Sequence, residues 1–221
     1  MKKIIFLLFV FAASARASQI VINGGFDFTP TNLDITAQGG GRDKIGTLGP
    51  AGGMQALYDV NPHLALGLDL NYADLHADRT RALLPILDAT MASHSLVALA
   101  AVKYTFLPNQ RVIPYFLAGI GLHHSAFHFE TRPVQGLVWP DTGTTESRSV
   151  AQGSSTNYAA LLGAGFDIPI SASVFLGAES RFQILGPVHF PVNGVFQSYG
   201  VQEVGGIELL VTTLLHVGYR F

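Results

Sequence analysis

The chain has 221 residues, of which 48% are hydrophobic and only 13% are charged, with 24 glycines and no cysteine. The lack of cysteine excludes disulfides, thiolate metal sites and catalytic thiols, and a formal net charge of −2 gives no general attraction to nucleic acid. A soluble domain carries about 25% charged residues, so the low charged fraction of this chain needs an explanation. A membrane-spanning helix does not supply it, because beyond the N-terminal segment no apolar run reaches the roughly 18 residues that such a helix needs.

The N-terminal segment has the composition of a secretory signal peptide. Two lysines precede the apolar run 4–13, and small residues follow it up to Ala17. This run is too short to cross a bilayer as a helix, and the basic start with an A-x-A site is typical of a cleaved leader. We expect cleavage after Ala17, with Ala15 as the alternative, which leaves 18–221 as the exported domain; an uncleaved anchor is the other interpretation.

Eight segments are candidate strands because apolar residues recur at every second position. Leu64, Leu66 and Leu68, for example, alternate with small or polar residues such as Gly67 and Asp69. The alternation is clearest in 63–72, 94–106, 174–184 and 207–221. In chain order, the candidate strands are 20–28, 48–58, 63–72, 94–106, 112–129, 158–166, 174–184 and 207–221.

The second face of these strands carries glycine, alanine and a few isolated charges, which is too sparse for a solvated exterior. It is typical of the crowded interior of a small barrel whose apolar face meets lipid. Short connections near residues 59–62, 107–111 and 167–172 alternate with long ones at 29–47, 73–93, 130–157 and 185–205. The sequence therefore predicts an all-β fold: an eight-stranded antiparallel up-and-down transmembrane β-barrel with long outer loops and short periplasmic turns.

Aromatic residues gather where strands approach the short turns or the C-terminus. We expect them to form a periplasmic aromatic girdle that consists of Tyr58, Tyr104, Phe106, Phe166, Tyr219 and Phe221.

The C-terminal residues 215–221, Leu-His-Val-Gly-Tyr-Arg-Phe, resemble the final strand of Gram-negative outer-membrane barrels, and 112–121 and 161–167 resemble small porin-like barrels of the OmpW, OmpX and opacity-protein type. This resemblance implies location in the outer membrane of the cell and, for the terminal aromatic strand, recognition by the barrel-assembly machinery.

Charged residues on the inner face predict a polar network in the lumen. By alternation, Asp69, Lys103, Glu179, Arg181 and Glu208 point inward. Charges deprived of water persist only when they are paired, so we expect the two cations to be neutralised by some of the three acids, which closes the barrel. The alternative is a narrow path for solutes or protons along the same column.

Catalysis is the rival interpretation of the segment His123-His124-Ser125. A lipid-modifying enzyme would need a serine and a histidine facing the outer leaflet, but alternation turns His123 and Ser125 toward the lumen, with no third residue to orient the base. We predict a non-enzymatic protein with no catalytic residue, cofactor or metal site. His94, His124 and His128 lie on the lipid-facing side near the long connections, where we expect them to be polar residues above the hydrocarbon band. Contacts with lipopolysaccharide phosphates or with a divalent ion are the alternatives. The expected partners of the barrel as a whole include outer-membrane lipids and lipopolysaccharide.

The outer connections are expected to carry interactions, since binding usually resides on loops of rigid scaffolds. The segment 79–91 is apolar enough for a short helix or lid, and 141–153 is polar and expected to be mobile. The segment 188–199 either folds over the barrel mouth or exposes a patch for a surface partner or a small apolar ligand. The predicted role is a structural or interaction scaffold that displays loops around a plugged lumen, with a narrow channel as the alternative.

Overall fold

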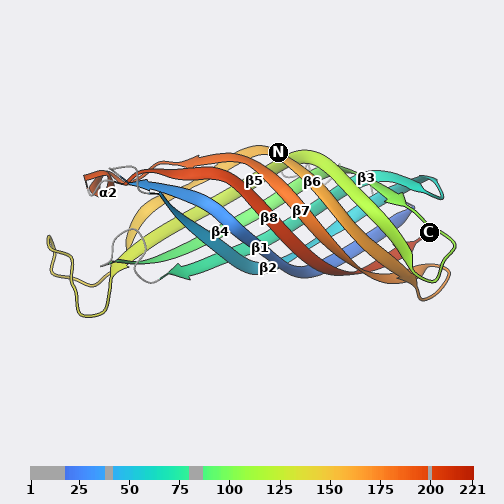
Figure 1. Ribbon diagram of the computed structural model, residues 1–221, viewed down its shortest axis with the longest axis horizontal. Helices are drawn as coiled ribbons and strands as arrows, with labels where there is room; N and C mark the ends of the chain where they lie inside the picture. Colours follow the sequence, from blue (N-terminus) through green and yellow to red (C-terminus); the bar gives the residue numbers. More distant parts are fainter. Residues whose placement is uncertain (1–17, 38–41, 80–86, 199–200) are drawn as a thin grey trace, which may run out of the picture.

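The described residues form eight antiparallel strands that close into a barrel (Figure 1). The computed structural model describes residues 18–37, 42–79, 87–198 and 201–221. The elements are β1 (Gln19–Ala37), β2 (Arg42–Asn61), β3 (Leu64–Arg79), β4 (Leu87–Thr105), β5 (Ile113–Pro133), β6 (Arg148–Pro169), β7 (Val174–Phe190), α2 (Gly194–Ser198) and β8 (Val201–Arg220). Each strand pairs with the next along the chain, and β1 pairs with β8, so the predicted up-and-down barrel is confirmed.

Side chains alternate between the outside and the inside of the barrel. On β4, Leu96, Val102 and Tyr104 are 42%, 41% and 46% exposed, whereas Val97 and Leu99 are 3% and 2% exposed. A continuous apolar exterior of this kind is the surface that lipid covers in a membrane barrel. Among the described residues, no helix has the length and apolar character to cross a membrane.

The polarity of the two faces reverses toward the end of the barrel that carries the long connections. On β3 the outward side chains change from Tyr72 to Asp74 and His76, and the inward ones change from Asn71 to Leu75. The neighbouring strands β4 and β5 make the same change, with His94, His124 and His128 outside and Met91, Phe127 and Phe129 inside. A sheet with an apolar inner face and a polar outer face is typical of a sheet whose outer face contacts water, so this end of the wall lies beyond the lipid.

The apolar exterior has the height of a single bilayer core. From Leu96 to Tyr104 on β4 the outward residues are all apolar. At about 3.4 Å per residue this stretch is about 27 Å long, and a strand tilt of about 40° reduces it to roughly 20 Å along the barrel axis, close to the apolar band of about 25 Å in outer-membrane barrels. The reversal of polarity therefore marks the level at which the barrel leaves the membrane.

The prediction of four long loops was wrong in extent, because the strands continue into them. β5 runs to Pro133 and β6 starts at Arg148, although a loop was expected over 130–157. In the segment 79–91, expected to form a helix or lid, Leu87 to Met91 belong to β4, and residues 80–86 lie outside the described part. The signal peptide 1–17 lies outside it as well. Above the lipid the outward positions of these strands are polar, so these outer parts lack the outward apolar residues by which the membrane-spanning parts are recognised.

The short turns gather at one end together with the C-terminus, opposite α2 (Figure 1). Asn61 shapes the first of them, because its Oδ1 accepts hydrogen bonds from the backbone N of His63 at 2.8 Å and of Leu64 at 3.0 Å. The backbone N of Phe221 donates to the carbonyl of Ser18 at 2.9 Å, which joins the last strand to the first. We refer to this end as the short-turn end.

Candidate functional site: the filled lumen

A buried arginine crosses the lumen. Arg181 on β7 is 1% exposed and reaches Asp69 on β3. Its Nη2 lies 2.9 Å from Asp69 Oδ2, and its Nη1 donates to Asp69 Oδ1 at 3.1 Å. The Nε of the same guanidinium pairs with Glu179. Because β3 and β7 lie on opposite sides of a ring of eight strands, this contact spans the full width of the barrel.

Neutral side chains complete the hydrogen bonding of both carboxylates. Asp69 accepts a hydrogen bond from Gln55 Nε2 at 2.8 Å and another from the amide of Asn71. The hydroxyl of Tyr115 on β5 donates to Glu179 Oε2 at 2.6 Å. A buried ion pair is tolerated when its remaining polar atoms are also bonded, so these contacts hold the network in one arrangement.

Lys103 has a different partner from those predicted. Its Nζ lies 2.7 Å from Asp167 Oδ2, with both side chains 3% exposed. His216 Nε2 lies 2.8 Å from the other oxygen of Asp167, and Lys103 Nζ also lies 4.0 Å from the centre of the Tyr115 ring. The expectation that this lysine is neutralised by Asp69, Glu179 or Glu208 was therefore wrong.

Asp167 falls in the segment 167–172, which the sequence predicts as a turn and not as part of the inner face. β6 continues to Pro169, so Asp167 takes the inward position that follows Gly163 and Gly165 in the alternation. Extending the strand by one further inward position is the signal that would have found it. His216, placed on the inner face by the same alternation, gave no indication of its partner.

Glycines in the wall make room for the large side chains of the lumen. A Cβ atom on Gly218 would lie 2.0 Å from Cζ of Phe175, and one on Gly177 would lie 2.3 Å from Nε2 of His216. These distances are far below van der Waals contact, so the positions accept no side chain unless the neighbouring ring moves. The glycines at these two positions therefore leave room in the lumen for the rings of Phe175 and His216.

Glu208 lies apart from the two networks. It is 1% exposed, and its Oε2 lies 3.8 Å from Nε2 of His123. Among the described residues, neither ring nitrogen of His123 nor Oε1 of Glu208 has a hydrogen-bond partner. Ser125, also fully buried, lies with its Oγ 3.3 Å from Oγ of Ser93, so no serine–histidine hydrogen bond forms in the segment considered as an enzymatic motif.

An apolar cluster closes the end opposite the short turns. Trp139 and Phe196 are 3% and 2% exposed and pack edge to face, with ring centres 6.0 Å apart. Phe127 and Phe190 stack at 4.6 Å. Within the apolar segment 188–199, Val188, Phe190, Val192 and Phe196 are buried in this cluster, whereas Pro191 is exposed. The burial of the four larger side chains agrees with the interpretation that this segment covers the barrel mouth.

The polar segment 141–153 is partly strand, since β6 starts at Arg148. Arg148 donates two hydrogen bonds to the carboxylate of Asp141, at 2.8 and 3.0 Å, and its guanidinium carbon lies 4.5 Å from the ring centre of Trp139. The Arg148 guanidinium holds the pKa of the Asp141 carboxyl below its ordinary value of 3.8. This ion pair therefore joins the polar loop to the apolar cluster.

The six residues predicted as an aromatic girdle all point outward near the short-turn end. Their exposed fractions lie between 39% and 73%. Tyr104 packs edge to face against Phe106 at 5.2 Å, and Tyr219 packs against Phe221 at 5.1 Å. Their roles in the lipid interface and as an assembly signal remain predictions.

Histidines lie on the outer surface beyond the apolar band. His94 Nδ1 is 3.0 Å from Asp74 Oδ1, and His124 Nδ1 is 2.8 Å from Thr156 Oγ1. In the register of β4 and β5, His94 lies opposite Ala126, so the two histidines are diagonal neighbours. Within the described ranges, no three histidine, aspartate or glutamate side chains are grouped in a way that could hold a metal ion.

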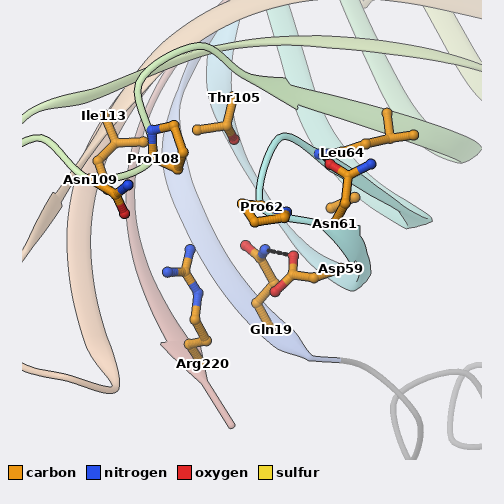
Figure 2. Close-up of a pocket in the computed structure, with 11 residues that line it drawn as sticks. Gln19, Asp59, Asn61, Pro62, Leu64, Thr105, Pro108, Asn109, Ile113 and Arg220 are labelled. Carbon is orange, nitrogen blue, oxygen red and sulfur yellow. Dashed lines mark hydrogen bonds between the residues drawn. The ribbon is translucent and has the colours of Figure 1, made fainter.

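A cavity of about 330 Å³ opens at the short-turn end of the lumen (Figure 2). Arg220 lies on one side of it, and Gln19 and Asp59 lie together on another, where Gln19 Nε2 donates to Asp59 Oδ1. Pro108 and Asn109 of a short turn lie over Arg220 in this view. These residues carry no sequence motif, because they lie far apart in the chain and meet only when the barrel closes.

An apolar exterior, a polar filled lumen and eight antiparallel strands closed in a ring define an integral membrane β-barrel. The chain belongs to the outer membrane protein beta-barrel domain family, whose model matches residues 4–221. This places the protein in the outer membrane of a Gram-negative cell. No curated protein matches the chain.

Solved structures share the fold at low sequence identity. The outer membrane protein OprG from Pseudomonas aeruginosa is 16% identical, with a TM-score of 0.50 and coverage of 93% of this chain and 97% of that one. The outer membrane protease OmpT from Escherichia coli is 9% identical, with a TM-score of 0.50 and coverage of 92% and 96%. Neisserial surface protein A is 15% identical, with a TM-score of 0.47 and coverage of 91% and 97%. A protease is among these structures, so the fold alone does not decide activity.

Proposed function

We propose that the protein is a non-enzymatic outer-membrane scaffold with a closed lumen that displays its outer end to partners. The observation that carries this proposal is the ion pair of Arg181 with Asp69, which crosses the barrel with both side chains 0% exposed. A side-chain contact across the full width leaves little space for a hydrated solute at that level. The apolar cluster around Trp139 obstructs the lumen a second time.

The experiment is single-channel recording with the purified, refolded protein in planar bilayers. We expect no steady discrete openings. A variant with both obstructions weakened, Arg181→Ala together with Trp139→Ala, serves as the positive control and is expected to conduct. Arg111→Ala, which removes a cation from an exposed turn, is expected to behave like the original protein. Steady openings of the unmodified protein would overturn the proposal.

A narrow path for water or protons is the second candidate, and one observation favours it. Among the described residues, both amide atoms of Asn23, one oxygen of Asp27 and one oxygen of Glu208 are buried without a hydrogen-bond partner. Buried polar atoms are usually bonded to protein or to ordered water, so these groups support the presence of internal water. Proton flux into vesicles loaded with a pH-sensitive dye distinguishes the candidates: the scaffold predicts no flux above that of empty vesicles.

The partners that we propose follow from the two surfaces. Lipids and lipopolysaccharide surround the apolar band, and the barrel-assembly machinery acts on the terminal aromatic strand. A surface partner would bind the outer end, where the wall is polar. The last of these is tested by labelling this protein with a fluorophore and measuring its binding to intact cells, with and without residues 134–147. The scaffold proposal predicts that the deletion abolishes binding while the barrel still folds.

A further inference from the structure

Three inward side chains on consecutive strands meet in the cavity at the short-turn end (Figure 2). Arg220 of β8 is the direct cross-strand partner of Gln19 of β1. Asp59 of β2 lies on the other side of Gln19 and accepts its amide hydrogen bond. A cation and an anion therefore flank one amide at the rim of the lumen.

Both charges are available to a ligand. Within the described part of the chain, no carboxylate lies within ion-pair distance of the Arg220 guanidinium, whose carbon lies 5.7 Å from the centre of the Phe175 ring. In the same part of the chain, Asp59 has no cationic partner, and its side chain is held by the neutral amide of Gln19. The cavity thus carries two opposite charges that do not neutralise each other.

Gln19 adds an acceptor that the described residues leave unbonded. The side chain is 3% exposed and lines the cavity, and its Oε1 has no hydrogen-bond partner among the described residues. An acceptor buried without a partner is costly, so a donor from outside the chain would be stabilised here. The oxygens of Gln19 and Asp59 both suit an ammonium group.

We propose that this cavity binds a small zwitterion, namely a free amino acid or a dipeptide. The ligand carboxylate would lie against the Arg220 guanidinium, which matches the planar geometry of a carboxylate. The ligand ammonium would lie against the Asp59 carboxylate, and Oε1 of Gln19, on the Arg220 side of that amide (Figure 2), would accept a hydrogen bond from the ligand. Asp59 and Arg220 are two strand spacings apart, about 10 Å, and Asp59 lies two residues further along its strand than the partner of Gln19. The volume of about 330 Å³ falls at the lower end of the range for small-molecule sites, about 300–1,000 Å³.

The test is calorimetric titration of the full-length protein, refolded in detergent micelles, with glycylglycine. Acetate and ethylammonium, each carrying one of the two charges, are titrated in parallel. The variants are Arg220→Gln and Asp59→Asn, and Arg111→Gln is the matched control because it removes a cation from an exposed turn at the same end without lining the cavity. The different gel mobility of heated and unheated samples shows that each variant is folded.

We expect saturable binding of glycylglycine that weakens by about tenfold or more in each of the two site variants and is unchanged in the control. Acetate and ethylammonium should bind more weakly than the dipeptide. Equal binding of acetate with no effect of Asp59→Asn would show a simple anion site and overturn the proposal. So would the absence of saturable binding to the folded protein, or binding that neither variant weakens. None of these outcomes bears on conductance, so the proposed scaffold role stands or falls separately.

Discussion

The Nη2 atom of Arg181 lies 2.9 Å from Oδ2 of Asp69 although the two residues are on opposite walls of the barrel. The pair joins strands that share no backbone hydrogen bonds. It therefore links β3 to β7 through the lumen in addition to the ladder around the ring. Side chains in the lumen contribute to the stability of this barrel as a core does in a soluble domain.

Replacing Arg181 by methionine should strongly destabilise the barrel, because it leaves the Asp69 and Glu179 carboxylates buried without their cation. Removal of one partner from a buried pair costs about 3–5 kcal/mol. The free energy of unfolding is measured by urea titration in lipid vesicles. Arg111→Met, on an exposed turn, should change it by less than about 0.5 kcal/mol. Equal effects of the two substitutions would contradict the role assigned to the pair.

Gly218→Ala should destabilise the short-turn end, because the new Cβ would lie 2.0 Å from Cζ of the Phe175 ring. Forcing extra volume into a packed interior costs about 1–3 kcal/mol. Adding Phe175→Leu should recover part of the loss. Gly24→Ala is the matched control, since its Cβ would find its nearest neighbour at 4.0 Å. Urea titration of the four proteins gives the comparison, and a loss in the Gly24 variant as large as that in the Gly218 variant would refute the explanation.

Phe196→Ala should open the apolar cluster at the outer end. Trp139 is the only tryptophan of the chain and packs edge to face on Phe196, so its fluorescence reports on this cluster. We expect a red-shifted emission and stronger quenching by acrylamide, together with a loss of roughly 3–5 kcal/mol, as for other buried phenylalanines. Leu137→Ala, at a position that is 42% exposed, should leave the emission unchanged. A red shift in the Leu137 variant alone would show that the cluster is placed wrongly.

Acid should release Asp141 from Arg148. Because the guanidinium lowers the pKa of this carboxyl in the folded protein, the pair stabilises the loop at pH values above 3.8, the ordinary value. That contribution is lost as the pH falls through the lowered pKa. Since Arg148 lies over Trp139, we expect the tryptophan emission to change over this acid range in the original protein. Asp141→Asn should show no such step, and an identical acid response in both proteins would exclude Asp141 as its source.

Alternation in the sequence was sufficient to place the five predicted lumen residues on the inner face, but it did not identify their partners. Whether Lys103 meets Asp167 or Asp69 depends on the stagger between strands that are not neighbours, and no local pattern records that stagger. The cavity of Gln19, Asp59 and Arg220 was missed for the same reason, since it forms only when the first and last strands pair.

The lengths of the strands were underestimated for a different reason. Leu66 and Tyr72 are recognisable because lipid requires an apolar exterior, whereas Asp74 and His76 continue the same strand in water. Where a strand crosses lipid, the apolar residues of its alternation point outward. Where it continues in water, the apolar residues point inward. Reading the inward Leu75 and Met91 as the new apolar face would have extended the predicted strands 63–72 and 94–106 toward the outer end.

Because the polarity of the two faces reverses, the strands continue above the membrane as a hydrogen-bonded wall. β5 contains 21 residues, which at about 3.4 Å each and a tilt of about 40° raise the wall to roughly 50 Å, twice the thickness of the apolar band. Antibodies or other molecules that approach from the medium would first encounter hydrogen-bonded strand wall and the ordered turn that it supports. Epitopes on such a wall depend on the folded chain and vanish when it is boiled.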